Sequence, residues 1–348
     1  MSVVVTCYNY AHYLAGAVQS AATQEGVLAD VLIVDDASTD DSLQIARGLA
    51  ARHSNVSVVE IPSNLGPAGA FNAGVREAAG EFVVRLDADD LLTPGSLRRA
   101  VEVARSFPSV GLVYGHPLHF RGEMLPPPRL RVTGWTLWPG RLWLSGRCRS
   151  SVNVITSPEV LMRRAVLEQV GYMSSLKHAH DMELWLRIAA FSNVAYVHGA
   201  DQAWHREHDA SLSQQKVNEI VDLNERLACF RTLFNGVAGS IPDAAQMNAT
   251  AHRALVAAAL ASAQSSLDRG RNRAESADAY LEFARSLDPT VTTTARWRSL
   301  SRRRDRVLDR RRAIPAELSV AALARRATTR LRSELHWRRW HREGVYEL

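Results

Sequence analysis

The stretch Phe82–Asp90, FVVRLDADD, joins a mostly apolar run to three closely spaced carboxylates. Such a run is typical of a strand buried in a parallel sheet, and ligands bind these sheets beyond the C-terminal ends of the strands. Carboxylates held this close repel one another, and a hard divalent cation would offset the repulsion. Asp87, Asp89 and Asp90 therefore predict either a Mg²⁺ or Mn²⁺ site or a solvated acidic turn that caps a helix near Pro94.

Strand-like and helix-like segments alternate on both sides of this stretch. We expect strands at residues 2–5, 31–34, 56–61, 82–86 and 111–114, and helices at 13–24, 42–52, 68–79 and 94–106. The alternation predicts an α/β fold with a mostly parallel central sheet and helices on both faces. Further along, we expect a long irregular loop at 117–146, helices at 163–170 and 181–191, a strand at 194–197, and only helices from residue 214 onward.

Polar residues follow the first two predicted strands. Thr6, Tyr8 and Asn9 come after the first strand, and Asp35 and Asp36 close the second. An aromatic ring can stack on a nucleobase, and a hydroxyl or carboxylate can bond to a base edge or a ribose hydroxyl. The alternative interpretation is an ordinary strand end followed by a turn rich in Asp, Ser and Thr.

Three further segments carry candidate chemistry. Asn64 and Gly66 belong to a turn before a helix, where backbone N–H groups could meet a phosphate. Asp181 lies in the first turn of a predicted helix, whose field favours the ionised carboxylate that a general base requires. His205 and His208 lie in an expected loop, where a histidine could bind a metal or a phosphate. Each has a plain alternative: a turn, a helix cap and a polar surface loop.

The net charge of +6 is unevenly distributed along the 348 residues. Residues 296–348 hold 16 arginines and 6 acidic residues, whereas residues 1–295 carry a net charge of −4. Because the main body is mildly acidic and has no nucleic-acid motif, a nucleic-acid partner is not expected. The Arg-rich segment, with Trp337 and Trp340, leaves open a solvated face, an anionic membrane surface or an acidic protein partner.

Three cysteines without metal-type spacing suit a reducing compartment. Neither a signal peptide nor an apolar run long enough to span a bilayer is recognisable. We therefore expect a cytoplasmic protein, with the basic segment leaving open a peripheral position at the inner face of the membrane.

The order of these motifs resembles the family 2 glycosyltransferases of the GT-A fold. VVVTCYN at the N-terminus is followed by LIVDDASTD, NLGPAGAFNAG, LDADD, HDMELWLR and WHREH, and the resemblance covers residues 1–213. It implies a nucleotide-sugar-binding half at 1–115 and an acceptor and catalytic-base half at 116–213. A helical region at 214–290 and an Arg-rich helical tail at 291–348 would follow.

The resemblance also implies a reaction, in which one sugar passes with inversion from a nucleoside diphosphate sugar, most simply a UDP-sugar, to a hydroxyl group. The acceptor would be a saccharide, a lipid-linked molecule or a small molecule in cell-surface polysaccharide or glycoconjugate biosynthesis. Asp181 matches the general base, and Asp89, Asp90 and His208 match the region of the divalent metal. The implied donor-binding residues are Thr6, Tyr8, Asn9, Asp35, Asp36, Asn64, Gly66, Asp87 and Asp89.

Three departures from the family pattern qualify this prediction. His180 replaces the usual Glu before the base, and Phe71 replaces an Arg that often precedes Asn72. The Gln-x-x-Arg-Trp signature of polymerising members is missing, so a single sugar transfer is expected. Alternatives are a nucleotidyltransferase of related fold and a scaffold that binds through its basic helical region. Trp135, Trp138 and Trp143 form either an acceptor platform or the core of their own loop.

Overall fold

The computed structural model describes residues 1–208, 219–269, 274–308, 322–328, 330–331 and 334–335. Within these residues a nine-stranded sheet has the order β3-β2-β1-β4-β8-β6-β9-β5, with β7 paired to β9. The strands are β1 (Ser2–Cys7), β2 (Asp30–Asp35), β3 (Val56–Glu60), β4 (Phe82–Asp87), β5 (Leu91–Leu92), β6 (Val110–Phe120), β7 (Gly134–Trp138), β8 (Leu161–Arg163) and β9 (Asn193–Arg206).

Strands β1 to β4 are parallel, so their C-terminal ends meet at one edge of the sheet. Strand β8 runs antiparallel to both β4 and β6, while β6 and β9 are parallel to each other. Strands β5 and β7 both pair antiparallel with β9. This arrangement confirms the mostly parallel α/β sheet and places the polar residues that follow β1, β2 and β4 side by side.

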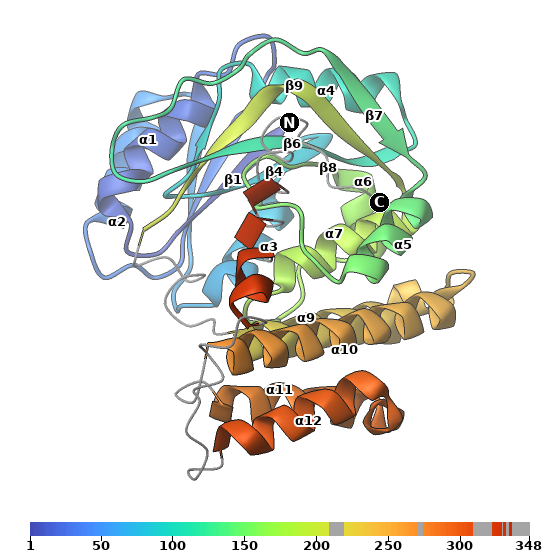
Figure 1. Ribbon diagram of the computed structural model, residues 1–348. Coiled ribbons are helices and arrows are strands. Elements are labelled where there is room, and N and C mark those ends of the chain that lie inside the picture. The colour runs from blue at the N-terminus through green and yellow to red at the C-terminus, as the bar shows by residue number, and fades with distance from the viewer. Residues whose placement is uncertain (209–218, 270–273, 309–321, 329, 332–333, 336–348) are drawn as a thin grey trace.

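Helices cover both faces of the sheet (Figure 1). One face carries α1 (Ala11–Ala22), α2 (Ser42–Arg52) and α4 (Ser96–Ser106). The other carries α3 (Gly66–Glu77), α5 (Gly140–Ser150), α6 (Arg164–Val170) and α7 (His180–Phe191). Strand β1 supports both layers because Val3 and Val5 pack with the first set and Val4 with the second.

Helix α3 lies directly on the sheet because Gly74 has no side chain. A Cβ at this position would lie 2.4 Å from Val4 Cγ1 and 2.8 Å from Val34 Cγ2. The glycine therefore lets the backbone of α3 approach β1 and β2. This close packing holds the first turn of α3, which begins at Gly66, beside the end of β2.

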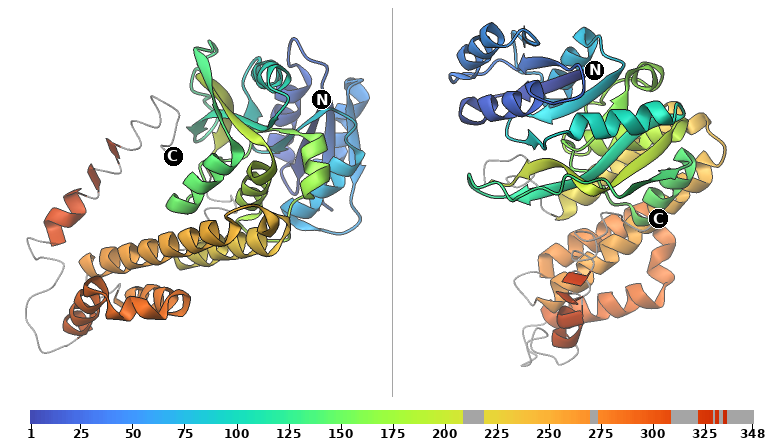
Figure 2. Two further views of the ribbon diagram at one scale, coloured as in Figure 1. Left: turned by 90° about the vertical axis from the view of Figure 1, so that its right-hand side faces the viewer. Right: turned by 90° about the horizontal axis from the view of Figure 1, so that it is seen from above.

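A helical region follows the sheet and packs against the α5 and α7 side of the molecule (Figures 1 and 2). It comprises α9 (Glu219–Asn235), the 3-10 turn η1 (Val237–Ser240), α10 (Ala244–Asp268), α11 (Ala274–Leu287), the 3-10 turn η3 (Pro289–Thr293) and α12 (Ala295–Leu308). Helix α11 ends just before Asp288 and Pro289, because proline cannot continue a helix. None of the described helices is long and apolar enough to cross a membrane.

Part of the basic charge in the C-terminal segment is neutralised inside this helical region. Arg303 and Arg325 both pair with Asp268 of α10, and Arg304 Nη1 lies 3.3 Å from Asp278 Oδ1 of α11. These arginines therefore join helices of the chain itself. Ile314-Pro315, where the proline predicts a helix break, lies outside the described residues, as do Trp337 and Trp340.

The prediction of an irregular loop over 117–146 is wrong. Strand β6 continues to Phe120, β7 occupies Gly134–Trp138 and α5 begins at Gly140, so the irregular stretch is 121–133. The physical reason is pairing with β9, which is 14 residues long and supports both β6 and β7. The register shift at Pro117 accommodates a residue that has no N–H to donate.

The tryptophans of this segment do not form a common platform. Trp138 and Trp143 are buried in the core, and Trp143 Nε1 donates to the Tyr114 hydroxyl at 3.3 Å. Trp135 is 52% exposed, beside Phe107. Trp138 and Trp143 thus belong to the main core beneath the sheet and not to a separate core of an irregular loop.

Candidate functional site

The ends of β1 and β4 form the centre of the polar edge. Thr6 and Asp87 are partners in the sheet register, and the Thr6 hydroxyl donates to Asp87 Oδ1 at 2.8 Å. Arg85, from the same strand, donates through Nη2 to both oxygens of Asp87 at 2.7 and 3.0 Å. Burial works to raise the pKa of Asp87, but the Arg85 charge and the Thr6 hydroxyl outweigh it and lower that pKa. Asp87 is therefore an ionised acceptor at the edge of the sheet.

Asp89 lies two residues farther on, among like charges. Burial and the charges of Asp90 and Asp87 raise the pKa of Asp89 to about 6, although His208 works against this. His208 Nε2 lies 2.9 Å from Asp89 Oδ2. The fold thus brings together two predicted site residues that are far apart in the chain, at 89 and 208.

Asp90 is turned into the protein. Its Oδ1 accepts the backbone N–H of Arg206 at 2.8 Å, and its Oδ2 lies 3.1 Å from His205 Nδ1. The negative charge of Asp90 outweighs the effect of burial and raises the pKa of His205 to about 9. His205 and Arg206 belong to β9, so the expected surface loop is wrong at these two positions. Asp90 thus attaches β9 to the acidic turn.

At the end of β2, Asp36 is bound to the start of α3. The backbone N–H groups of Leu65 and Gly66 donate to its two oxygens at 2.7 and 2.9 Å. Burial raises the pKa of Asp36, and these two hydrogen bonds oppose that shift. Gly66 has a φ of 74°, which a residue with a side chain rarely adopts. The Asn64 side chain donates to the Asp36 carbonyl at 3.2 Å, which closes the turn.

Asp35 is also buried, and its Oδ2 accepts the Ser38 N–H at 3.1 Å. Its Oδ1 has no hydrogen-bond partner among the described residues. Asn9 has a φ of 57° and accepts the Thr39 N–H through Oδ1 at 2.7 Å. Asn9 therefore joins the turn after β1 to the turn after β2. Tyr8 is 46% exposed at the same edge and is free to contact a ligand.

Asp181 lies in the first turn of α7, one residue after the helix begins at His180. Its Oδ2 lies 3.3 Å from Asn153 Nδ2 and 3.5 Å from Ser157 Oγ, and its Oδ1 accepts the Met182 N–H at 2.6 Å. The two side-chain donors come from the segment between α5 and β8. This geometry holds the carboxylate in the first turn of α7, near the positive end of the helix dipole.

His180 lies between the acidic turn after β4 and Asp181. Its Nε2 lies 3.4 Å from Arg85 Nη1, and its Nδ1 lies 3.2 Å from the Leu176 carbonyl oxygen. Burial and the Arg85 charge lower the pKa of His180, while Asp181 and Asp87 oppose this. Sequence reasoning noted His180 as a departure but did not include Arg85 in the site. An arginine within an otherwise apolar strand was the available signal, because a buried guanidinium needs a partner.

A cavity of about 620 Å³ opens between the first turn of α3 and the segment that precedes α7. Leu65, Gly66 and Asn72 contribute to one wall, and Met173 and His178 contribute to the other. Asn72 holds the two walls together, because its side chain forms hydrogen bonds of 2.8 and 2.9 Å with the Met173 backbone. The cavity thus lies between the Asp36 turn and the helix of Asp181.

The family model described as glycosyl transferase family 2 matches residues 2–171. Residues 2–171 belong to this family. The ExoU succinoglycan biosynthesis protein of Rhizobium meliloti is 30% identical over 198 residues, which cover 54% of this chain and 56% of ExoU. The chain therefore spans about half of the length of that curated relative, and less of others that it matches.

Solved glycosyltransferase structures share the GT-A-like fold of this chain. TarS 1–349 of S. aureus, in complex with UDP-GlcNAc, has a TM-score of 0.56 and 18% identity, covering 84% of this chain and 91% of that chain. The mannosyltransferase PcManGT from Pyrobaculum calidifontis, in complex with GDP-Man and Mn²⁺, has a TM-score of 0.55 and 20% identity. That match covers 88% of this chain and 84% of PcManGT. At these identities the likeness establishes the fold alone.

The carboxylates of the acidic turn after β4 are of a type that suits a divalent cation whose remaining ligands are phosphate oxygens and water. Within the described residues no group of three His, Cys, Asp or Glu side chains is arranged to hold a metal alone. The side chains of Asp89 and His208 nevertheless lie in contact. A cation bound there would offset the electrostatic repulsion of Asp89 by Asp87 and Asp90. Mg²⁺ is usually held by one or two protein carboxylates together with phosphate oxygens and water.

Proposed function

We propose that this chain is a glycosyltransferase that moves one sugar from a nucleoside diphosphate sugar to a hydroxyl acceptor, with inversion. The observation that carries the proposal is the line of contacts Thr6–Asp87–Arg85–His180, which ends beside Asp181. These contacts connect the edge of the sheet that we assign to the sugar donor with a carboxylate suited to act as a general base. The family match at 2–171 favours glycosyl transfer over nucleotidyl transfer.

The nucleoside is assigned to the ends of β1 and β2. Tyr8 is exposed there for stacking on the base, and Asp35 Oδ1 is a buried acceptor without a partner among the described residues. Thr6 and Asp87 face the ribose, while Asp36, Asn64, Gly66 and Asn9 hold the surrounding turns in place. UDP is the nucleotide we propose first, because TarS is similar in fold and its structure was solved with UDP-GlcNAc.

The diphosphate is assigned to the turn that follows β4. Asp89 and His208 would hold Mg²⁺ or Mn²⁺ there, and Asp90 holds the turn against β9. The bound cation would neutralise charge that develops on the departing diphosphate. Arg206 contributes order to the same turn because its Nε donates to the Asp89 carbonyl at 2.9 Å.

Asp181 is assigned as the general base. It takes the proton of the acceptor hydroxyl while the oxygen attacks the anomeric carbon from the side opposite the diphosphate. Asn153 and Ser157 orient the carboxylate at the start of α7. One in-line displacement inverts the anomeric configuration, and the hydroxyl proton finishes on Asp181.

Surface polysaccharide synthesis is the proposed setting, because ExoU is a succinoglycan biosynthesis protein. A cytoplasmic position and a contact of the Arg-rich segment with an anionic membrane or an acidic protein stay predictions. Vesicle pelleting of the full chain, compared with a variant that ends at Pro289, tests the membrane contact.

The test of the function combines binding and turnover. UDP and GDP, each with MnCl₂, are screened for thermal stabilisation of the full chain. UDP-glucose, UDP-N-acetylglucosamine and GDP-mannose are then assayed with p-nitrophenyl glycosides as acceptors. We expect Asp181→Asn to retain nucleotide binding and to lose transfer by about 10²–10⁴-fold. Transfer at the parental rate by Asp181→Asn would contradict the assignment of the base.

A further inference from the structure

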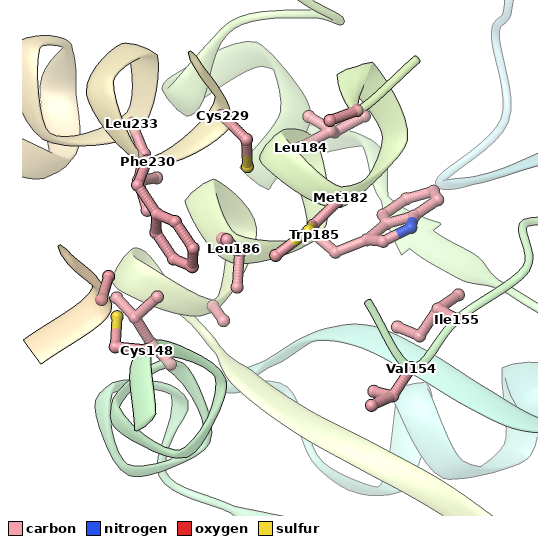
Figure 3. Close-up of a cluster of buried hydrophobic side chains, with 14 of the residues drawn as sticks. Cys148, Val154, Ile155, Met182, Leu184, Trp185, Leu186, Cys229, Phe230 and Leu233 are labelled. Carbon is pink, nitrogen blue, oxygen red and sulfur yellow. The ribbon is translucent and has the colours of Figure 1, made fainter. Parts of the chain in front are cut away.

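Helix α9 of the C-terminal region shares a core with α7, the helix that carries the proposed base in its first turn. Cys229, Phe230 and Leu233 of α9 are fully buried and lie against α7, whose Met182 and Leu186 belong to the same cluster (Figure 3). This packing places one face of α9 along the first turns of α7. The helical region is thus joined to the α/β part near the site.

Polar contacts from α9 reach the backbone just before Asp181. Glu225 Oε2 accepts the N–H of His178 at 2.9 Å and the N–H of Ala179 at 3.3 Å. Ala179 is the residue that precedes the first turn of α7, and no side chain caps this helix from that position. The segment that leads into α7 therefore receives a carboxylate from a helix more than 40 residues further along the chain.

The neighbouring residue of α9 holds the other segment that faces Asp181. Arg226 Nη1 donates to the Ser151 carbonyl at 2.9 Å, and Asp222 pairs with Arg226 Nη2 at 2.8 Å. Ser151 lies two residues before Asn153, whose amide reaches Asp181. Two adjacent residues of α9 thus fix both chain segments that determine where the carboxylate of Asp181 lies.

We propose that Glu225 is a positioning residue for glycosyl transfer, acting on Asp181 through the backbone at His178 and Ala179. This inference rests on the function proposed above. Reacting groups must be aligned closely, and a misplacement of about 1 Å can cost about 10²-fold in rate. The helical region would therefore be needed for turnover, although it lies outside the residues that match the family model.

Three substitutions at position 225 distinguish the length of the side chain from its charge. Because a single oxygen accepts both N–H groups, Glu225→Gln keeps the acceptor at the same distance. Glu225→Asp keeps the charge but shortens the side chain by one methylene, and Glu225→Ala removes the contact. The matched control is Glu219→Gln on the same helix, since Glu219 accepts from the Tyr280 hydroxyl at 3.1 Å, away from α7.

The first measurement is amide hydrogen exchange on the full-length variants. We expect exchange in residues 178–182 to become at least about tenfold faster in Glu225→Asp and Glu225→Ala. Glu225→Gln and Glu219→Gln should match the parent. Unchanged exchange in the Asp and Ala variants would overturn the proposal, and the Gln–Asp comparison decides it if the Ala variant does not fold.

The second measurement is the initial rate of transfer from UDP-glucose, UDP-N-acetylglucosamine or GDP-mannose to p-nitrophenyl glycosides. We expect kcat to fall about 10–100-fold in Glu225→Asp and Glu225→Ala. Binding of UDP with Mn²⁺, followed by calorimetry, should stay within twofold of the parent. Parental kcat in the Asp variant, or an equal loss in the Gln variant, would overturn the proposal. An inactive parent would instead count against the proposed function, and hydrogen exchange would still test Glu225.

Discussion

The substitution Asp89→Asn should stabilise the metal-free protein. Asp89 is 12% exposed, and burial with the charges of Asp90 and Asp87 raises its pKa from 3.8 to about 6. The folded state thus favours the protonated carboxyl, and this contribution to stability is lost as the pH rises through about 6. At 1.36 kcal/mol per pKa unit, ionised Asp89 costs up to about 3 kcal/mol at pH 7.5. An amide of the same shape removes that cost and can still accept from His208.

Thermal unfolding in EDTA at pH 7.5 measures this effect. At about 2 °C per kcal/mol, the melting temperature of Asp89→Asn should exceed that of the parent by up to about 6 °C. At pH 5 the parent is partly protonated at this position, so the difference should fall to about half. Asp30→Asn makes the same chemical change at an exposed carboxylate and should alter the melting temperature little.

Adding UDP and MnCl₂ should reverse the order of stability. The parent gains stability from the ligand, whereas Asp89→Asn lacks the charge that is proposed to hold the cation. A melting temperature for Asp89→Asn below that of the parent in EDTA at pH 7.5 would refute the electrostatic reasoning. A difference that does not narrow at pH 5 would show that the gain has another origin.

Three other outcomes are expected. Gly74→Ala should lower the free energy of unfolding, measured in urea, by about 1–3 kcal/mol, because a Cβ would lie 2.4 Å from Val4. Gly48→Ala should raise this free energy by about 0.5–1 kcal/mol, because a Cβ there would meet nothing within 4 Å. Arg85→Met should lower the free energy of unfolding by about 2 kcal/mol. This is less than the 3–5 kcal/mol expected when a fully buried ion pair loses one partner, because Asp87 is 31% exposed. An unchanged urea midpoint would contradict this expectation. EDTA should abolish the thermal stabilisation by UDP while the circular dichroism spectrum stays the same, and stabilisation that persists in EDTA would count against the metal site.

The structure divides the predicted site residues into two groups. Asp87, Asp89, Tyr8 and Asp181 lie where a ligand can reach them or carry the chemistry proposed above. Asn9, Asn64 and Asp90 use their side chains to tie turns and strands together. Asp89 and Asp90 both follow the end of β4, so a sequence pattern that identifies the sheet edge does not tell a contact residue from a supporting one.

Local patterns were enough for most of the first 106 residues, but they missed the short strand β5, which pairs with β9. The strands near 2–5, 31–34 and 82–86 and the helices between them agree with the structure to within a few residues. Hydrophobic periodicity, turn residues and strand-end carboxylates are properties of short segments, which is why they can be read without tertiary contacts. The placement of Asp89 at a strand end and of Asp181 at a helix start follows from the same local signals.

Long-range pairing decided the rest. Strand β6 continues through Pro117 to Phe120 because β9 pairs with it, and β9 extends to Arg206 because Arg206 is the register partner of Phe120. The link from Arg85 to His180 spans 95 residues, and that from Glu225 to His178 spans 47. The order of residues thus specifies which side chains can form hydrogen bonds or ionise, and which class of sheet carries them. Their partners depend on the folded chain, because a hydrogen bond requires distances that chain order does not specify.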